Sequence, residues 1–461
     1  MEIKKFRLQH LGRFAQLEAE LAPTRDIHSK VTVFIGNNGA GKTSVLKALA
    51  TSLSWFVARL RSEKGSGSPI PEGVILNNQV SALIDVALFD EQGPSGNPDA
   101  DIHDYLYHWS LAKTEPGKKA TFSSNLNDAS RLADFYRVAL TKNAQASLPL
   151  IAFYPVERVV LDVPLKIKEK HSFLQLDGYD NSLNQGVDFR RFFEWFRERE
   201  DSENESGLPQ DVLDKLLATL GDNQEIWQKL QSVMASSRDR QLTAVRTAIS
   251  NFMPGFTNLR VRRKPRLHMS IDKDVETLNV LQLSQGEKSL MALVGDIARR
   301  LAMMNPALEN PLHGNGIVLI DEVDMHLHPK WQRSIIERLT ATFPNCQFIL
   351  TTHSPLVISD CKDVLVYSLN DGEIHRVPSQ YGEDANSVLL NVMDTHIRNA
   401  AITEKINDLL DLIQAADNPQ KIEGAKIKLD NLAAELPNDH LEVVKAKMFL
   451  RKRELKYAQN N

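Results

Sequence analysis

The eight residues GNNGAGKT, Gly36 to Thr43, constrain the fold of this 461-residue chain more than any other stretch. They fit the pattern G-x-x-x-x-G-K-[ST] in full, and they lie between the strand-like VTVFI and a segment with apolar residues at helical spacing. Glycines let such a loop wrap around phosphate groups with its N–H groups pointing inward, and the following helix N-terminus adds a positive partial charge. We expect Lys42 to reach the β- and γ-phosphates and the Thr43 hydroxyl to bind Mg²⁺. The residues that we expect to bind the nucleotide here are Gly36, Asn37, Asn38, Gly39, Ala40, Gly41, Lys42, Thr43 and Ser44.

Two apolar runs later in the chain end in groups suited to phosphate chemistry. The run Ile317 to Ile320 is followed by Asp321 and Glu322. If this strand lies next to the strand of the phosphate loop, Asp321 lies beside the Mg²⁺ and Glu322 can orient or deprotonate the attacking water. The run FILTT leads to His353, which in a parallel sheet would face the same site and could hydrogen-bond the γ-phosphate. We therefore predict ATP hydrolysis, with Glu322, His353 and Lys42 as catalytic residues.

A second small polar turn, LSQGEKS, opens another long helix. Ser284, the amides near Gly286 and Glu287 lie at the start of that helix, where N–H groups and the helix dipole attract anions. A chain with one complete phosphate loop needs no second one for the same nucleotide. We predict that Ser284, Gly286 and Glu287 contact ATP held by another copy of the chain.

Composition excludes several classes of protein. The net charge is −4, which argues against a strongly basic nucleic-acid binder. Only Cys346 and Cys361 occur, so a structural zinc site built on a C-x-x-C pair is not expected. The N-terminus lacks the apolar core of a secretory signal, and no run approaches the roughly 18 apolar residues of a membrane span. We expect a cytoplasmic protein that does not enter a membrane.

The order of segments predicts an α/β fold with a mixed β-sheet and flanking helices. QVSALIDVALFD and YLYHWSLA predict an antiparallel β region attached to the nucleotide-binding sheet. We expect an N-terminal lobe with the phosphate loop over residues 1–187 and a charged helical insertion over 188–257. Residues 258–400 would hold the second turn, the acidic strand end and His353. Residues 401–461 would form a helical tail that docks a partner.

The four motifs together resemble ABC-type ATPases of the recombination and chromosome-maintenance group. GNNGAGKT, LSQGEKS, GIVLIDE and TTHS stand in the order of their Walker A loop, signature, Walker B strand and switch histidine. The resemblance implies an ABC-type ATPase head that uses ATP and Mg²⁺ and closes as a head-to-head dimer over two nucleotides. The segment between Walker A and signature is too short for long coiled-coil arms. Glu157 and Arg158 stand where such ATPases usually carry a glutamine, so we expect turnover to be slow.

LRSEKGSGSPI, FRRFFEWFRERED and YGEDANSVL extend the resemblance to the PtuA-type ATPases of Septu and retron anti-phage systems. That family implies a homodimer or larger assembly in which nucleotide state controls an HNH endonuclease partner similar to PtuB. It also allows nucleic acid, or a retron reverse transcriptase with its msDNA, as a partner. No acidic nuclease constellation follows His353, so we expect no intrinsic nuclease site.

One alternative is a DNA-repair ATPase of the RecF kind, which binds DNA as an ATP-dependent dimer. It would use the basic strip made of Arg260, Arg262, Arg263, Lys264 and Arg266. A solvated strand face explains the same strip. A transporter ATPase subunit fits the signature but not the helical insertion and tail.

Overall fold

The computed structural model describes residues 1–92, 105–156, 173–184, 187, 189–206, 239–395, 398–437 and 440–460. The chain divides into two units, Met1–Ala385 and Asn386–Asn461. Within the described ranges, no helix combines the length and apolar character that crossing a membrane requires.

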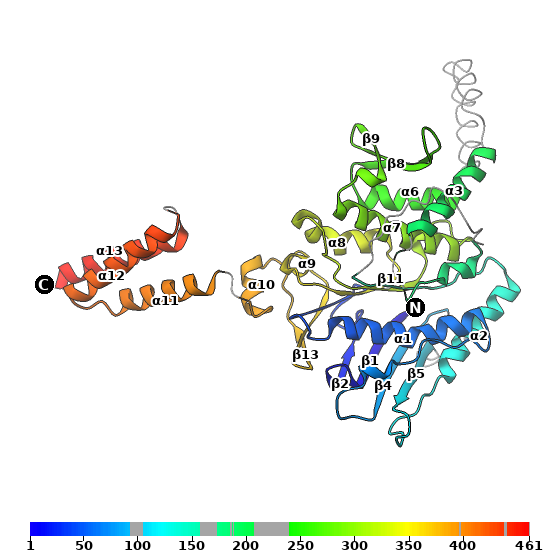
Figure 1. The fold of residues 1–461 in the computed structure, drawn as a ribbon, viewed down its shortest axis with the longest axis horizontal. Coiled ribbons are helices and arrows are strands. Elements are labelled where there is room, and N and C mark those ends of the chain that lie inside the picture. Colours follow the sequence, from blue (N-terminus) through cyan, green and yellow to red (C-terminus); the bar gives the residue numbers. More distant parts are fainter. Residues whose placement is uncertain are drawn as a thin grey trace, which may run out of the picture. The chain divides into compact units, whose positions relative to one another are not determined.

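The centre of the first unit is a six-stranded sheet that is parallel except for one edge strand. Its strands are buried apolar runs, as expected where helices cover both faces of a parallel sheet. Figure 1 shows α1 (Lys42–Arg61) and the pair α7 (Gln285–Met304) and α8 (Pro329–Thr342) on opposite faces. In spatial order the strands are β13 (Glu373–Val377), β12 (Leu365–Asn370), β3 (Val31–Gly36), β11 (Cys346–Thr351), β10 (Gly316–Ile320) and β6 (Leu150–Tyr154).

A four-stranded antiparallel sheet forms the second layer, and α1 lies between it and the parallel sheet. Its first two strands form a hairpin that turns at Gly12 and pairs Leu11 with Phe14. The helix α2 (Asn127–Lys142) packs beside α1, where the buried Tyr136 ring meets the Phe56 ring edge to face. In spatial order the strands are β2 (Phe14–Glu20), β1 (Glu2–Leu11), β4 (Ser81–Phe89) and β5 (Leu106–Thr114).

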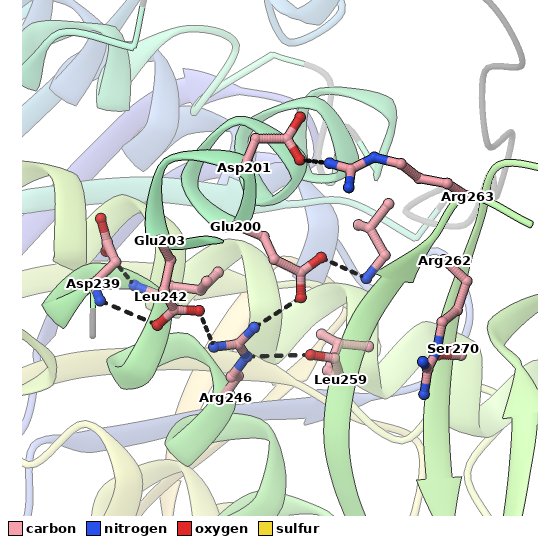
Figure 2. Close-up of polar contacts among 11 residues, drawn as sticks. Glu200, Asp201, Glu203, Asp239, Leu242, Arg246, Leu259, Arg262, Arg263 and Ser270 are labelled. Atoms are coloured by element: carbon pink, nitrogen blue, oxygen red, sulfur yellow. Dashed lines mark hydrogen bonds and ion pairs between the residues drawn. The ribbon is translucent and has the colours of Figure 1, made fainter. Parts of the chain in front are cut away.

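The helices α3 (Phe189–Ser206) and α6 (Arg240–Phe252) are joined to a third, antiparallel sheet by a polar network (Figure 2). Arg246 of α6 donates to Glu203 at 2.8 Å, to Glu200 at 2.9 Å and to the Leu259 carbonyl at 3.2 Å. Glu200 also accepts the Val261 N–H at 2.8 Å, and its burial raises the pKa of that carboxyl. The network therefore holds both helices against the strand that contains Leu259 and Val261, the first strand of this sheet. Its strands are β7 (Phe256–Arg262), β8 (His268–Lys273) and β9 (Glu276–Asn279).

The second unit has its own core. The helices α11 (Ala400–Gln414), α12 (Pro419–Glu435) and α13 (Leu441–Asn460) lie side by side (Figure 1). Their buried residues form one cluster that includes Ile406, Leu409, Leu429, Val443 and Leu450. A separate helix, α10 (Ala385–Asn391), precedes them.

The structure confirms the predicted α/β class, with a mixed sheet and flanking helices. One detail of the prediction is wrong: the strand that ends at Asp321 does not lie next to the strand of the phosphate loop. β11 lies between β3 and β10. Its end therefore places Thr351 and His353 between the phosphate loop, which follows β3, and Asp321, which follows β10. In a parallel sheet the order of strands depends on crossover connections, which an apolar run does not encode.

Candidate nucleotide-binding site

The phosphate loop joins β3 to α1, as its spacing predicts. Gly41 is the N-cap residue just before α1, with φ 102°, and a Cβ atom there would lie 2.5 Å from the Phe14 ring. The glycine is therefore required both by the backbone conformation and by the packing of the β1–β2 hairpin against the loop. Lys42 is only 5% exposed. Its ammonium donates to the carbonyls of Gly36 at 2.8 Å and Asn37 at 3.1 Å, so it lies inside the loop.

Burial lowers the pKa of the Lys42 ammonium, although nearby carboxylates, Glu322 first, act in the opposite direction. A buried cation held by two carbonyl oxygens is prepared for an anion, because a phosphate would compensate the desolvation of the ammonium. The loop thus has the electrostatic character that its sequence predicts.

Asp321 links the phosphate loop to the two strands beyond it. Its carboxylate accepts the Thr43 hydroxyl at 2.8 Å and the Thr351 hydroxyl at 2.6 Å. Asp321 is 1% exposed, and its own N–H donates to the Tyr154 carbonyl at 2.9 Å. A hydroxyl and a carboxylate oxygen in contact are ligands that Mg²⁺ prefers, so Thr43 and Asp321 fit the predicted metal site. Thr351 was not among the predicted site residues, although the motif TTHS contains it.

Glu322 follows Asp321 in a strained backbone conformation. Its φ is 45°, in the left-handed region that non-glycine residues seldom occupy. The Glu322 N–H donates to the Thr351 hydroxyl at 2.7 Å, and the Val323 N–H donates to the Thr351 carbonyl at 2.9 Å. Strain of this kind persists where surrounding contacts enforce it, which is frequent at functional sites. The end of β11 therefore determines the direction in which Glu322 leaves its strand.

His353 lies two residues after the end of β11 and is exposed. Before it, Thr352 hydrogen-bonds the Asp324 carboxylate, and the Thr352 N–H donates to the Phe34 carbonyl at 3.2 Å. After it, Ser354 caps the short helix α9 (Pro355–Ser359). His353 thus lies on a segment held at both ends, beside the strands of the phosphate loop and of Asp321.

The signature turn, Ser284 to Glu287, is built as a helix cap. The Ser284 N–H donates to the Glu287 carboxylate at 2.8 Å, and the Glu287 N–H donates to the Ser284 hydroxyl at 3.3 Å. Lys273 at the end of β8 donates to the other oxygen of Glu287 at 2.7 Å. These contacts lower the pKa of the Glu287 carboxyl although burial raises it. Glu287 therefore shapes the turn, a role that its predicted contact with ATP did not include.

Gly286 lies against the loop that follows Asp321 and Glu322. A Cβ atom on Gly286 would lie 2.3 Å from the carbonyl oxygen of His326.

Two histidines, His326 and His328, lie in this loop. His326 has φ 63°, and His328 accepts the Lys330 N–H at 3.2 Å as the cap of α8. Among the described residues, no group of three or more His, Cys, Asp and Glu could hold a metal ion. The two histidines contribute to the shape of the loop.

A buried polar cluster connects the signature helix α7 to the Asp321 backbone. Asp296 is completely buried and accepts from Arg299 at 2.7 Å, from Arg300 at 2.6 Å and from the Tyr154 hydroxyl at 2.9 Å. Because Tyr154 also accepts the Asp321 N–H, the cluster joins α7 and β6 to the acidic strand end. No sequence motif indicated this connection.

Arg13 is a second residue that the motifs missed. It is exposed on the β1–β2 turn, and its guanidinium would lie 3.2 Å from a Cβ atom on Gly39. A cavity of about 250 Å³ adjoins the loop through Ser44 and is lined also by Gly12, Lys47, Ile84 and Phe153. The β1–β2 turn therefore contributes a cation and a cavity wall beside the phosphate loop.

The basic strip is partly neutralised. Arg263 pairs with Asp201, and Arg262 donates to Ser270 at 3.3 Å (Figure 2). Arg260, Lys264 and Arg266 are exposed. Glu157 and Arg158, the predicted substitutes for a glutamine, lie outside the described residues.

Comparisons with known proteins agree with the motifs. Residues 31–359 match the family described as "AAA domain, putative AbiEii toxin, Type IV TA system". "Retron Ec83 probable ATPase" of Escherichia coli is 36% identical over 386 residues, which are 75% of this chain and 68% of that protein. "Retron Vc95 probable ATPase" of Vibrio cholerae serotype O1 biovar El Tor is 30% identical over 433 residues, 88% of this chain and 82% of that protein.

Two further matches are more limited. "Septu protein PtuA" of Bacillus mycoides (strain KBAB4) is 34% identical over 165 residues, 33% of this chain and 22% of that protein. Among solved structures, an SMC head bound to the C-winged helix domain of ScpA is 15% identical, with a TM-score of 0.44. That alignment covers 82% of this chain and 98% of the SMC chain.

Proposed function

This chain is an ATPase of the AAA-domain family and a homologue of the retron ATPases, and from that premise we propose that its nucleotide state controls a partner HNH endonuclease in anti-phage defence. The ATPase part is supported above all by one observation: Asp321 is held by both Thr43 and Thr351. The defence part is supported by relatives whose names include retron and Septu proteins.

We assign the chemistry to residues of this chain. Lys42 and the loop amides hold the phosphates, and Thr43 with Asp321 would hold Mg²⁺, which supplies charge neutralisation at the phosphates when bound. Glu322 orients the attacking water and accepts its proton, and His353 hydrogen-bonds the γ-phosphate. The strained turn at Glu322 keeps its carboxylate from relaxing into an ordinary strand end.

We further propose that two copies complete each site. Within the described residues, the hydrogen bonds of Ser284 and Glu287 stay inside the turn or reach Lys273, and none reaches the phosphate loop of the same chain. Ser284 is exposed at a helix N-terminus, which suits an anion presented by a second copy. The active unit would then be a homodimer or a larger assembly of such pairs.

The test uses a complex of this chain with the proposed HNH endonuclease partner, obtained by co-purification. Lys42→Ala should weaken ATP binding, and Glu322→Gln should retain bound ATP. We expect the Glu322→Gln complex to hold the nuclease inactive in ATP and the Lys42→Ala complex to cleave DNA. Lys142→Ala, at an exposed lysine on α2, is the matched control. Equal cleavage by both site variants would refute nucleotide control.

The alternative, an ATP-dependent DNA clamp, depends on the exposed cations Arg260, Lys264 and Arg266. It predicts DNA binding that weakens with salt and with the double change Arg260→Glu and Arg266→Glu. DNA affinity that is unchanged by this charge reversal would remove the clamp hypothesis.

A further inference from the structure

Helix α13 has two apolar faces, and the core of its unit accounts for one. Val443, Ala446 and Leu450 are buried in the cluster with α11 and α12. On the opposite face, large apolar side chains are exposed to solvent. They are Leu441 (62% exposed), Val444 (41%), Met448 (68%) and Leu455 (58%); a fifth, Phe449 (52%), lies off this face, about 100° around the helix from Met448.

The four exposed residues other than Phe449 form a single stripe along the helix. Their spacing of three, four and seven residues matches helical periodicity, so the side chains follow one another along one face. An isolated exposed leucine is ordinary, whereas an aligned set on one helix marks an interaction surface. We call these four residues the α13 stripe.

Cations lie on both sides of the α13 stripe. At 100° per residue, Lys447 and Arg451 flank it on one side, and Lys452 and Lys456 flank it on the other. All four are exposed, and none of them forms an ion pair with another residue in the part of the chain that the structure describes.

The acids of α13 are already engaged. Glu442 pairs with Arg398 at 3.0 Å and with Lys445 at 3.3 Å, and Glu454 pairs with Lys426 at 2.8 Å. The outward face of the helix is therefore apolar along its centre and positively charged along both edges.

This chemistry selects one kind of occupant. A second α13 helix would place like charges edge to edge, which opposes self-association. A nucleic acid would neutralise the cations but leave leucine and methionine side chains in water. An amphipathic helix with an apolar seam and Asp or Glu on its edges satisfies both features.

We infer that the α13 stripe docks an acidic amphipathic helix of a partner protein. The inference depends on the proposed function only in requiring that a partner protein exists. The stripe supplies the apolar anchors of the interface, and the four cations orient the partner helix.

The test measures binding of labelled peptides to the full-length chain. One peptide has about four heptads with Leu at positions a and d and Glu at e and g; the other has Lys at e and g. The variants are Met448→Glu with Leu455→Glu and, separately, Arg451→Glu with Lys452→Glu. Matched controls are Val138→Glu, an exposed apolar residue on α2, and Lys118→Glu with Lys119→Glu, an exposed adjacent pair.

We expect the Glu peptide to bind, each α13 double variant to lose about tenfold or more in affinity, and the controls to stay within about twofold. The Lys peptide should not bind. Equal binding of both peptides, or Glu-peptide binding insensitive to the α13 variants, would overturn the inference. So would α13-dependent binding of single-stranded DNA or phosphatidylserine vesicles in place of the Glu peptide. The peptide assay contains no nuclease, so it is independent of whether nucleotide controls one.

Discussion

Gly286 of the signature turn lies directly against the carbonyl oxygen of His326, in the loop that follows the acidic strand end. A Cβ atom on the glycine would lie 2.3 Å from that oxygen, closer than real contacts allow. The glycine is therefore needed for packing within the chain itself, whether or not it contacts a nucleotide.

Gly286→Ala should displace the loop at His326 and, with it, the residues after Glu322. Displacements of about 1 Å in a catalytic site can cost about 100-fold in rate, so ATP hydrolysis should fall strongly. ATP binding at the phosphate loop should change little. Gly73→Ala, where an added Cβ meets nothing within 4 Å, is the control. Parental hydrolysis by Gly286→Ala would show that the loop accommodates the methyl group without consequence.

Ser284→Arg should leave ATP bound and prevent association of two copies. The new side chain would occupy the exposed helix N-terminus that we assign to the partner's nucleotide. The measurement is size-exclusion chromatography with light scattering, with and without ATP, in a Glu322→Gln background. Ser123→Arg, at an exposed position on another loop, is the control. Undiminished ATP-induced association in Ser284→Arg would eliminate the two-copy site.

Glu322→Gln should slow hydrolysis by a factor of about 100 to 10,000, which is the usual contribution of a general base. Glutamine keeps the size of the side chain but cannot accept the proton, so ATP should stay bound and the dimer should last longer. Single-turnover hydrolysis and bound-nucleotide analysis would measure both effects. Glu337→Gln, an exposed residue on α8, is the control. A variant as fast as the parent would mean that another group activates the water.

Arg13→Ala should raise the KM for ATP without altering the fold. The guanidinium lies beside Gly39 and is exposed, so its removal takes away a cation from the phosphate loop and leaves the core intact. We expect a loss of about tenfold in ATP affinity, the scale of one hydrogen bond to a charged group. Arg25→Ala, another exposed arginine, is the control. Titration with a fluorescent ATP analogue would detect the loss, and equal affinities would leave Arg13 without a role in nucleotide binding.

Asp296→Asn should destabilise the first unit by about 3–5 kcal/mol, because it leaves two buried arginines without their counter-ion. Burial raises the pKa of Asp296, but attraction to Arg300 and Arg299 outweighs it and the pKa is lowered. A carboxyl with a lowered folded pKa stabilises the protein above its unfolded pKa, and that stability is lost as pH falls through the folded value. The difference between parent and variant should therefore be largest near neutral pH and shrink below about pH 4. Urea unfolding at several pH values measures it, and a difference independent of pH would contradict the ionic explanation.

Much of the site was predictable because its information is local. The glycines of GNNGAGKT encode a backbone conformation, and the apolar runs before Asp321 and His353 predict strands that end where those residues lie. Contacts between distant segments were not predictable. The strand β11 between β3 and β10, the Thr351 hydroxyl on Asp321 and the place of Arg13 all depend on strand order and on the packing of a hairpin.

The signature turn separates the two kinds of information. The sequence by itself determined that a helix starts at the turn that holds Ser284, and the capping box that the structure adds there joins Ser284 only to Glu287, three residues later. Only the tertiary structure decided three further contacts of this helix. Gly286 packs against the His326 carbonyl, Lys273 donates a hydrogen bond to Glu287, and Asp296 accepts one from the Tyr154 hydroxyl. These contacts join residues far apart in the chain. They form only when the sheets and helices have packed, so no local pattern encodes them.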